Sequence, residues 1–342
     1  MLLSNKNINS IIKLLLMLSF ITPILMLYVY QYDAFPPYPY YYDPDANSFE
    51  VLWKGRTFYI FFLWIFTLEL ILSWEELEVI NLSTKSIRTF LLIIALILPT
   101  LYVVKANFYG LNRGIVDLIY SYGIKPGCDW MPLAMEYLVL TILFALVLVI
   151  TYGVSGIAKM SMSIILLGTI GLIYTIDNIY PEGNFTPFQA LIPITALLAT
   201  NFLQIIGYKV IWLGTTNGMP DYVVADPVGG GSIEFLIGWP CSGIESLLIY
   251  ALTIPLFLRN SNIPRKQQIV YFLFGAAVTY FINIIRIMLI VMVGINEGSI
   301  AFQRFHDFYG PLLPISWIIA YPLIIIGTRA IWRKIRNKST RD

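Results

Sequence analysis

The sequence predicts an all-α polytopic membrane protein with about eight or nine transmembrane helices and a small extracytoplasmic β-hairpin. Hydrophobic residues make up 58% of the 342 residues and charged residues only 12%, and the mean hydropathy is +0.74. These proportions lie outside the range of soluble globular domains. Apolar runs of a length that can cross a hydrocarbon layer also recur along the whole chain.

Nine apolar runs are candidates for membrane spans, and no charged or Pro/Ser-rich linker divides the chain into two halves. We therefore expect a single integral domain over 1–342, with an N-terminal helical half at 1–208 and a C-terminal catalytic core at 209–332. The first run lacks a small-residue cleavage site, so we expect it to remain as an anchor. The runs are 11–30, 57–74, 88–104, 133–151, 160–176, 188–208, 241–258, 267–293 and 312–332.

The placement of basic residues predicts the orientation. Arg259, Arg265 and Lys266 fill the short turn after the run 241–258, and a basic tail follows the last run. Cytoplasmic loops are enriched in Lys and Arg, so both segments should be cytoplasmic. The run 241–258 ends at the cytoplasmic side, so its first residues should lie at the extracytoplasmic side. We expect a multi-pass protein of the cytoplasmic membrane with its functional site on the extracytoplasmic side.

The loop before residue 241 is rich in glycine and in β-forming residues. Segments 222–225 and 233–237 have strand composition and flank three consecutive glycines, which predicts a hairpin. In the second strand Ile233, Phe235 and Ile237 would share one face. The edge of such a hairpin could hold an extended peptide by strand addition, or the hairpin could simply cap the helical bundle.

Cys241 lies in the sequence G-W-P-C-S-G-I-E-S, directly before an apolar run. Pro240 suits the first helical position, so we expect Cys241 in the first helical turn, beside unpaired backbone N–H groups. That environment favours the thiolate, which is the nucleophilic form of cysteine. The alternative is that Cys241 only packs the start of the helix. Cys128 is the only other cysteine, so a disulfide framework is excluded.

Glu245 and Arg286 are charged residues that lie within apolar runs of the C-terminal part. Arg286 would lie near the outer boundary of the membrane, level with Cys241, and Asn283 would share its helical face. Glu245 is one helical turn beyond Cys241 on the same face. Charged residues in membrane segments usually pair or have a functional role, so an ion pair between Glu245 and Arg286 is one interpretation.

His306 is the only histidine, and it precedes the last apolar run on the same outer side as Cys241. Arg304, two residues earlier, is the other candidate for the basic residue of the site. One histidine and two cysteines exclude a histidine-rich metal site, and no nucleotide or metal motif occurs in a supporting context, so neither a metal nor a cofactor is expected. The net charge is only +2 and basic residues gather near helix ends, so nucleic acid is not an expected partner.

Three segments occur in an order that resembles the exosortase/archaeosortase family, and in particular its archaeal-type members. They are C-S-G-I-E-S at 241–246, N-I-I-R-I at 283–287 and F-H-D-F-Y-G at 305–310. The resemblance implies a membrane cysteine transpeptidase or protease with Cys241 as nucleophile, Arg286 as the family arginine and His306 as the third catalytic residue. Supporting or substrate-binding roles would then belong to Glu245, Asn283, Ser242 and Arg304.

The resemblance also implies the partners of the protein. The substrates would be surface proteins with a CTERM-type C-terminal sorting signal, cut before their membrane helix, and a lipid amine would be the acceptor of the new C-terminus. A different interpretation is a transporter or channel in which the ion pair of Glu245 and Arg286 lines a polar path. A structural scaffold is a third, and it leaves the ordered cysteine, arginine and histidine segments unexplained.

Overall fold

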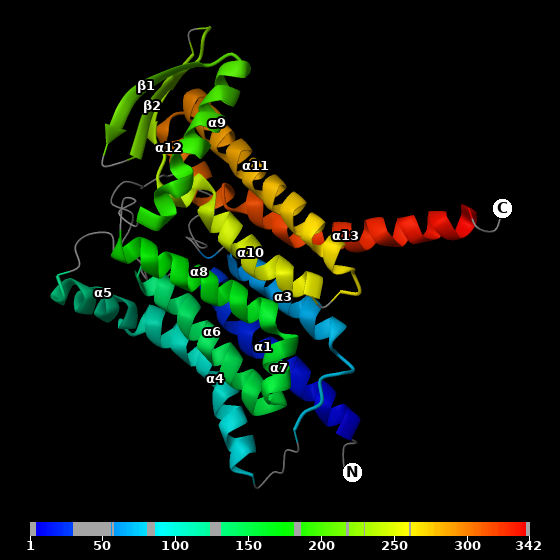
Figure 1. Cartoon of the computed structure of the whole chain (residues 1–342). Coiled ribbons are helices and arrows are strands. Elements are labelled where there is room, and N and C mark those ends of the chain that lie inside the picture. Colours follow the sequence, from blue (N-terminus) through cyan, green and yellow to red (C-terminus); the bar gives the residue numbers. More distant parts are fainter. Residues whose placement is uncertain are drawn as a thin grey trace. The chain divides into compact units, whose positions relative to one another are not determined.

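The computed structural model describes residues 5–29, 56, 58–80, 86–123, 131–180, 186–216, 219–228, 230–259 and 261–339. The chain forms two compact units, Met1–Phe185 and Thr186–Asp342 (Figure 1). Each of the nine predicted runs contains a helix in the described residues.

Within the described residues, five helical stretches are long and apolar enough to span a membrane, and three shorter apolar helices accompany them. The prediction of a polytopic, mainly helical membrane protein is therefore confirmed. The long stretches are Asn7–Leu27, Ile87–Phe108, Met131–Tyr152, Arg265–Glu297 and Ser299–Trp332, and the shorter ones are Phe58–Leu72, Ser161–Ile176 and Gln189–Ile205.

The first unit is a helical bundle in which α6 packs against both α4 and α8. Its core contains Phe20, Phe62, Phe66 and Phe144, all buried and arranged mostly edge-to-face, which is the favoured geometry for aromatic rings. The helices are α1 Asn5–Val29, α3 Phe58–Leu72, α4 Ile87–Phe108, α5 Leu111–Ser121, α6 Met131–Tyr152, α7 Val154–Lys159 and α8 Ser161–Ile179.

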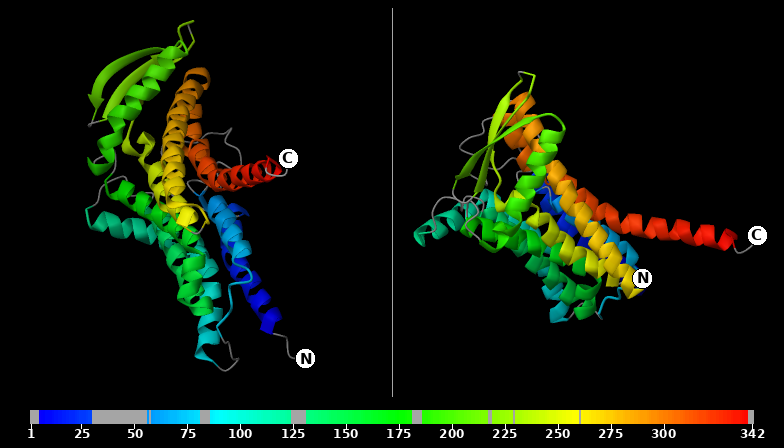
Figure 2. Two further views of the ribbon diagram at one scale, coloured as in Figure 1. Left: turned by 45° about the vertical axis from the view of Figure 1, so that its right-hand side comes forward. Right: turned by 45° about the horizontal axis from the view of Figure 1, so that its top comes forward.

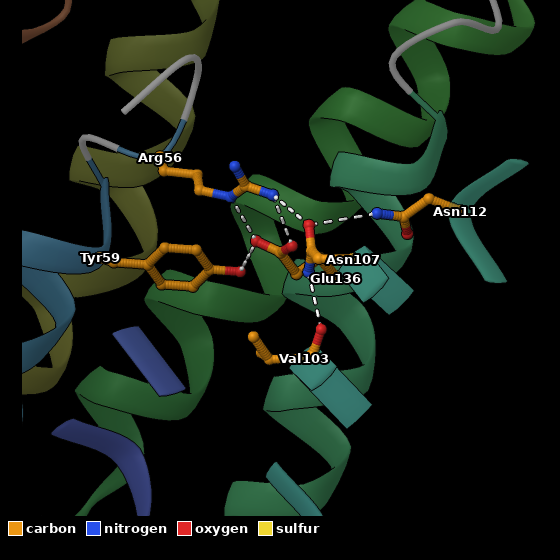
Figure 3. A network of polar contacts seen from close by, with 6 residues as sticks. All are labelled: Arg56, Tyr59, Val103, Asn107, Asn112 and Glu136. Atoms are coloured by element: carbon orange, nitrogen blue, oxygen red, sulfur yellow. Dashed lines mark hydrogen bonds and ion pairs between the residues drawn. The ribbon is translucent and has the colours of Figure 1, made fainter. Parts of the chain in front are cut away.

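A buried ion pair joins Arg56, two residues before α3, to Glu136 of α6 (Figure 3). Arg56 donates from Nε and Nη2 to the two carboxylate oxygens of Glu136, at 2.9 Å each. The Tyr59 hydroxyl donates to the same carboxylate at 3.0 Å, and Arg56 also donates to the side chain of Asn107 at 3.3 Å. Glu136 is 0% exposed, so these donors replace the water that its charge would otherwise need.

The second unit is organised around α11, a helix of 33 residues that packs against α9, α10, α12 and α13. Both views of Figure 2 show α10 lying along α11. The elements in chain order are η3 Thr186–Leu191, α9 Ile192–Ile205, β1 Lys209–Thr216, β2 Met219–Ala225, β3 Ser232–Leu236, η4 Trp239–Ser242, α10 Ile244–Arg259, α11 Arg265–Glu297, α12 Ser299–Arg304, η5 Phe305–Tyr309 and α13 Leu312–Ser339.

The sheet of this unit has three strands, where the sequence predicted a two-stranded hairpin. The order is β1-β2-β3 with both pairs antiparallel, and Gly207, at φ 106°, lies in the turn between α9 and β1. The additional strand β1 was missed because its apolar residues continue directly from the run 188–208. The predicted shared face of Ile233, Phe235 and Ile237 is confirmed, since all three are buried and Glu234 between them is exposed.

Candidate active site

Cys241 lies in the short 3₁₀ helix η4, not in the first turn of α10 as the sequence suggested. Its backbone N–H donates to the carbonyl of Gly238 at 3.1 Å, so it is not one of the free N–H groups of a helix start. Gly243, at φ 93°, separates η4 from α10. This left-handed conformation is accessible to glycine at little cost, and it turns the chain between the cysteine and the helix.

The imidazole of His306 lies against the Cys241 thiol. The distance from Sγ of Cys241 to Nε2 of His306 is 2.8 Å. His306 belongs to η5, a single π-helical turn between α12 and α13, in which the N–H of Gly310 bonds to the carbonyl of Phe305 at 2.7 Å. Such turns occur often at functional sites, because they displace side chains from the regular helical positions. A thiol and an imidazole at this distance can exchange a proton.

A carboxylate that the sequence analysis did not single out holds the other side of the imidazole. Oδ1 of Asp307 is 2.8 Å from Nδ1 of His306, and the amide of Gln303 donates to both carboxylate oxygens at 3.1 and 3.2 Å. The i, i+4 spacing of Gln303 and Asp307 on a helix could have indicated their contact. The result is a chain of side chains from Gln303 through Asp307 and His306 to Cys241.

Asn283 of α11 contacts the backbone of Cys241, and Arg286 of the same helix contacts Asn283. The side-chain amide of Asn283 donates to the carbonyl of Cys241 at 2.9 Å, and Arg286 reaches Oδ1 of Asn283 from Nη1 at 3.4 Å. Asn283 is 0% and Arg286 4% exposed. Among the described residues, Nε of Arg286 is buried without a hydrogen-bond partner. Gly310 lies against this nitrogen, because a Cβ built there would be 2.8 Å from it.

The other predicted site residues are Ser242, Glu245 and Arg304, and each has a different relation to the Cys241 thiol. Ser242 is fully buried, and its hydroxyl donates to the carbonyl of Trp239 at 2.7 Å, so it stabilises η4. Glu245 lies in the first turn of α10, and its negative charge acts on the thiol of Cys241. Arg304 ends α12, while the contact with the sulfur is made by His306. The ion pair of Glu245 with Arg286 stays a prediction.

Neighbouring charges determine the ionisation of the Cys241 thiol, which lies outside the long apolar helices. Burial raises the pKa of Cys241, but the charge and hydrogen bond of His306 lower it, with a further contribution from Arg286. Glu245 opposes them, and the net effect is a pKa below the ordinary value of a thiol. The lowered pKa favours the thiolate form of Cys241, which lies against the imidazole of His306.

A cavity of about 410 Å³ opens beside these groups. Cys241 and His306 lie in its wall, together with residues 234–237 of β3 and the turn after it. Its apolar lining comes from Ile287, Ile290, Val291 and Phe302. A substrate chain could therefore reach the thiol through this cavity.

No metal centre is found in the part of the chain that the structure describes, where no three His, Cys, Asp or Glu side chains are grouped to hold an ion. Cys128 lies outside the described residues.

A family model described as a transmembrane exosortase (Exosortase_EpsH) matches residues 53–324, which include all of the residues around Cys241 described above. No curated protein and no solved structure matches the chain.

Proposed function

Since the chain belongs to the transmembrane exosortase family, we propose that it is a membrane cysteine transpeptidase that cleaves the C-terminal sorting signal of surface proteins. Membership of this family supports a general role in membrane transpeptidation and protein sorting. The observation that carries the finer assignment is the 2.8 Å contact of the Cys241 thiol with the His306 imidazole at the wall of a cavity.

The reaction begins with attack of the Cys241 thiolate on a peptide carbonyl carbon of the substrate. A C–S bond forms and the carbonyl oxygen takes the negative charge of a tetrahedral intermediate. The C–N bond then breaks, and His306 gives its proton to the departing amine, which leaves with the membrane helix of the substrate. The retained part of the substrate is a thioester on Cys241.

The second half of the reaction transfers this acyl group to an acceptor. The imidazole of His306, now neutral, takes a proton from the attacking amine or water, and the thiolate of Cys241 leaves. We propose a lipid amine as the acceptor, because a multi-pass membrane protein can receive it from the bilayer. Hydrolysis by water is the simpler outcome of the same intermediate.

Arg286 is proposed to stabilise the negative charge of the tetrahedral intermediate. Its guanidinium is buried, is held by Asn283, and keeps one N–H without a hydrogen-bond partner in the described chain. A donor held in place before the reaction stabilises a developing oxyanion more effectively than water does. The same positive charge lowers the pKa of the Cys241 thiol.

Asp307 is proposed to position His306. Its carboxylate accepts a hydrogen bond from Nδ1–H, which leaves Nε2 directed at the sulfur, and it stabilises the imidazolium that forms. Gln303 holds the carboxylate in turn. We place the site on the extracytoplasmic side, on the basis of the basic turn after α10 and the basic tail.

The test follows a tagged surface protein that carries a C-terminal membrane helix and a basic tail, in cells that produce this protein or its variants. We expect a mass decrease that matches loss of the helix and tail, and an added lipid mass if transfer follows. Cys241→Ser, His306→Ala and Arg286→Ala should abolish the change, whereas Cys128→Ser should not.

Unaltered processing in Cys241→Ser would contradict the proposal. If solute flux across the membrane then depended on Glu245 and Arg286, the transporter interpretation would replace it.

A further inference from the structure

The strand β3 is an end strand of the sheet, and it leads directly to the cysteine. Only four residues separate its last residue, Leu236, from Cys241. One edge of β3 pairs with β2, and within the described residues the other edge pairs with no strand. Unpaired strand edges bind extended chains through backbone hydrogen bonds.

The register shows which backbone groups of β3 lie on the free edge. Gly231 accepts from Asp226 at 3.1 Å and Ile237 donates to Pro220 at 3.2 Å, so both residues bond toward β2. Hydrogen bonding alternates along an antiparallel strand, and the intervening register is regular. The N–H and C=O groups of Glu234 and Leu236 therefore point away from β2.

The same residues line the cavity that contains the thiol. Glu234, Phe235, Leu236 and Ile237 form one part of its wall, and Cys241 lies in the wall as well. A strand added to β3 would therefore run past the sulfur. The volume of about 410 Å³ is sufficient for side chains of a peptide but not for a folded domain.

The cavity is apolar on the side of α11. Ile287, Ile290 and Val291 are all buried, at 4%, 3% and 0% exposure, and Phe302 of α12 completes this lining. Side chains of a strand alternate between two faces, so every second side chain of an added strand would face α11. An apolar side chain at that place would be removed from water, which favours binding.

We propose that the substrate segment around the scissile bond binds as a fourth strand on the free edge of β3 and inserts one apolar side chain into the cavity lined by α11 and α12. This inference rests on the proposed function only in that Cys241 is taken as the nucleophile. The backbone of β3 holds the chain, and the apolar lining selects the residue beside the scissile carbonyl.

The test uses reagents that alkylate the thiol, with the full-length protein in detergent and Cys128→Ser as background. Peptidyl chloromethyl ketones of four residues mimic the substrate: the thiolate of Cys241 forms a C–S bond with the methylene carbon and chloride leaves. Iodoacetamide reacts in the same way with loss of iodide, but it is too small to bind along the edge of β3, so its rate reports only the reactivity of the thiol. The rate of peptide labelling divided by the rate of iodoacetamide labelling then measures recognition.

Two results are expected of the peptide series. A leucine at one position should label about tenfold or more faster than glycine or aspartate there, because an apolar side chain is buried. N-methylation of the peptide amides should slow labelling about two- to tenfold at alternate residues and have little effect between them, because only alternate N–H groups face β3.

Variants of the protein provide matched pairs. Glu234→Pro removes an N–H from the free edge of β3, while Val210→Pro makes the same change on the outer edge of β1. Val291→Phe fills the cavity, while Val293→Phe changes the same helix outside it. We expect the first variant of each pair to slow peptide labelling about fivefold or more relative to iodoacetamide labelling, and the second to leave the ratio unchanged.

Equal sensitivity of all amides, or a ratio unchanged in Glu234→Pro and Val291→Phe, would overturn the inference while leaving Cys241 as a reactive thiol. Failure of the proposed function has a different signature, in which Cys241 reacts with iodoacetamide no faster than a free cysteine in solution.

Discussion

The most informative single substitution is Asp307→Asn, because it removes a charge and keeps the shape of the side chain. Asp307 contacts Nδ1 of His306 at 2.8 Å, and Nε2 of the same ring is 2.8 Å from the Cys241 sulfur. The carboxylate stabilises the imidazolium, and the imidazolium lowers the pKa of the thiol. We therefore expect the pKa of Cys241 to rise in Asp307→Asn.

The size of the effect follows from the contact. A hydrogen bond to a charged group contributes about 1.5–3 kcal/mol. The side chains of His306 and Asp307 are 30% and 20% exposed, and solvent screening favours the lower end of that range. About 1.4 kcal/mol corresponds to one pKa unit, so the thiol pKa should rise by about one unit and the thiolate fraction should fall about tenfold at pH values below it.

The assay is the rate of iodoacetamide labelling of Cys241 as a function of pH. The variant should react about tenfold more slowly on the acidic limb of the profile, and the two curves should converge at high pH, where the thiol is ionised in both proteins. Asp221→Asn, in β2, is the matched control and should follow the unsubstituted protein. Identical profiles for Asp307→Asn and the unsubstituted protein would refute the positioning role of Asp307.

Three further predictions concern both units. Glu136→Gln should lower the free energy of unfolding by about 3–5 kcal/mol, because it leaves Arg56 buried without its counter-charge, and joint replacement of the pair by Met and Leu should restore most of the loss in thermal unfolding. Gly310→Ala should reduce processing by displacing the guanidinium that its Cβ would contact at 2.8 Å, whereas Gly327→Ala, with open space around it, should not. Because the pKa of the active-site thiol is lowered, its alkylation should persist below about pH 8, where free cysteine becomes largely protonated and slow. Normal unfolding of Glu136→Gln, full activity of Gly310→Ala, or a free-cysteine pH profile would contradict the respective argument.

The helices of the fold could be predicted because each apolar run carries its own signal. The strand β1 could not, since Lys209–Thr216 continues the apolar character of α9 and only the turn at Gly207 ends the helix. The buried pair in the first unit was overlooked, although Glu136 lies in an apolar run, where an acidic residue indicates a partner.

Cys241, Arg286 and His306 could be singled out from the sequence as candidates, but the geometry of their contacts could not be predicted. The depth of Arg286 in its helix and the position of Cys241 before an apolar run placed both residues near one level. The 3₁₀ turn of the cysteine depends on the left-handed Gly243, and the orientation of His306 depends on a π-helical turn. Both turns also contact elements that are distant in the sequence, such as α11, which local sequence patterns do not show. Asp307 was missed, although its i, i+4 spacing from Gln303 could have indicated that contact.

In the proposed mechanism Cys241 forms a thioester with the substrate. This intermediate can be detected directly by mass-spectrometric peptide mapping of protein that has been incubated with a sorting-signal substrate and quenched in acid, with and without hydroxylamine. We expect an adduct on Cys241 with the mass of the substrate up to its scissile bond, its release by hydroxylamine as a hydroxamate, and no such adduct in Cys241→Ala. Continued cleavage in Cys241→Ala, or an adduct on another residue, would contradict the mechanism.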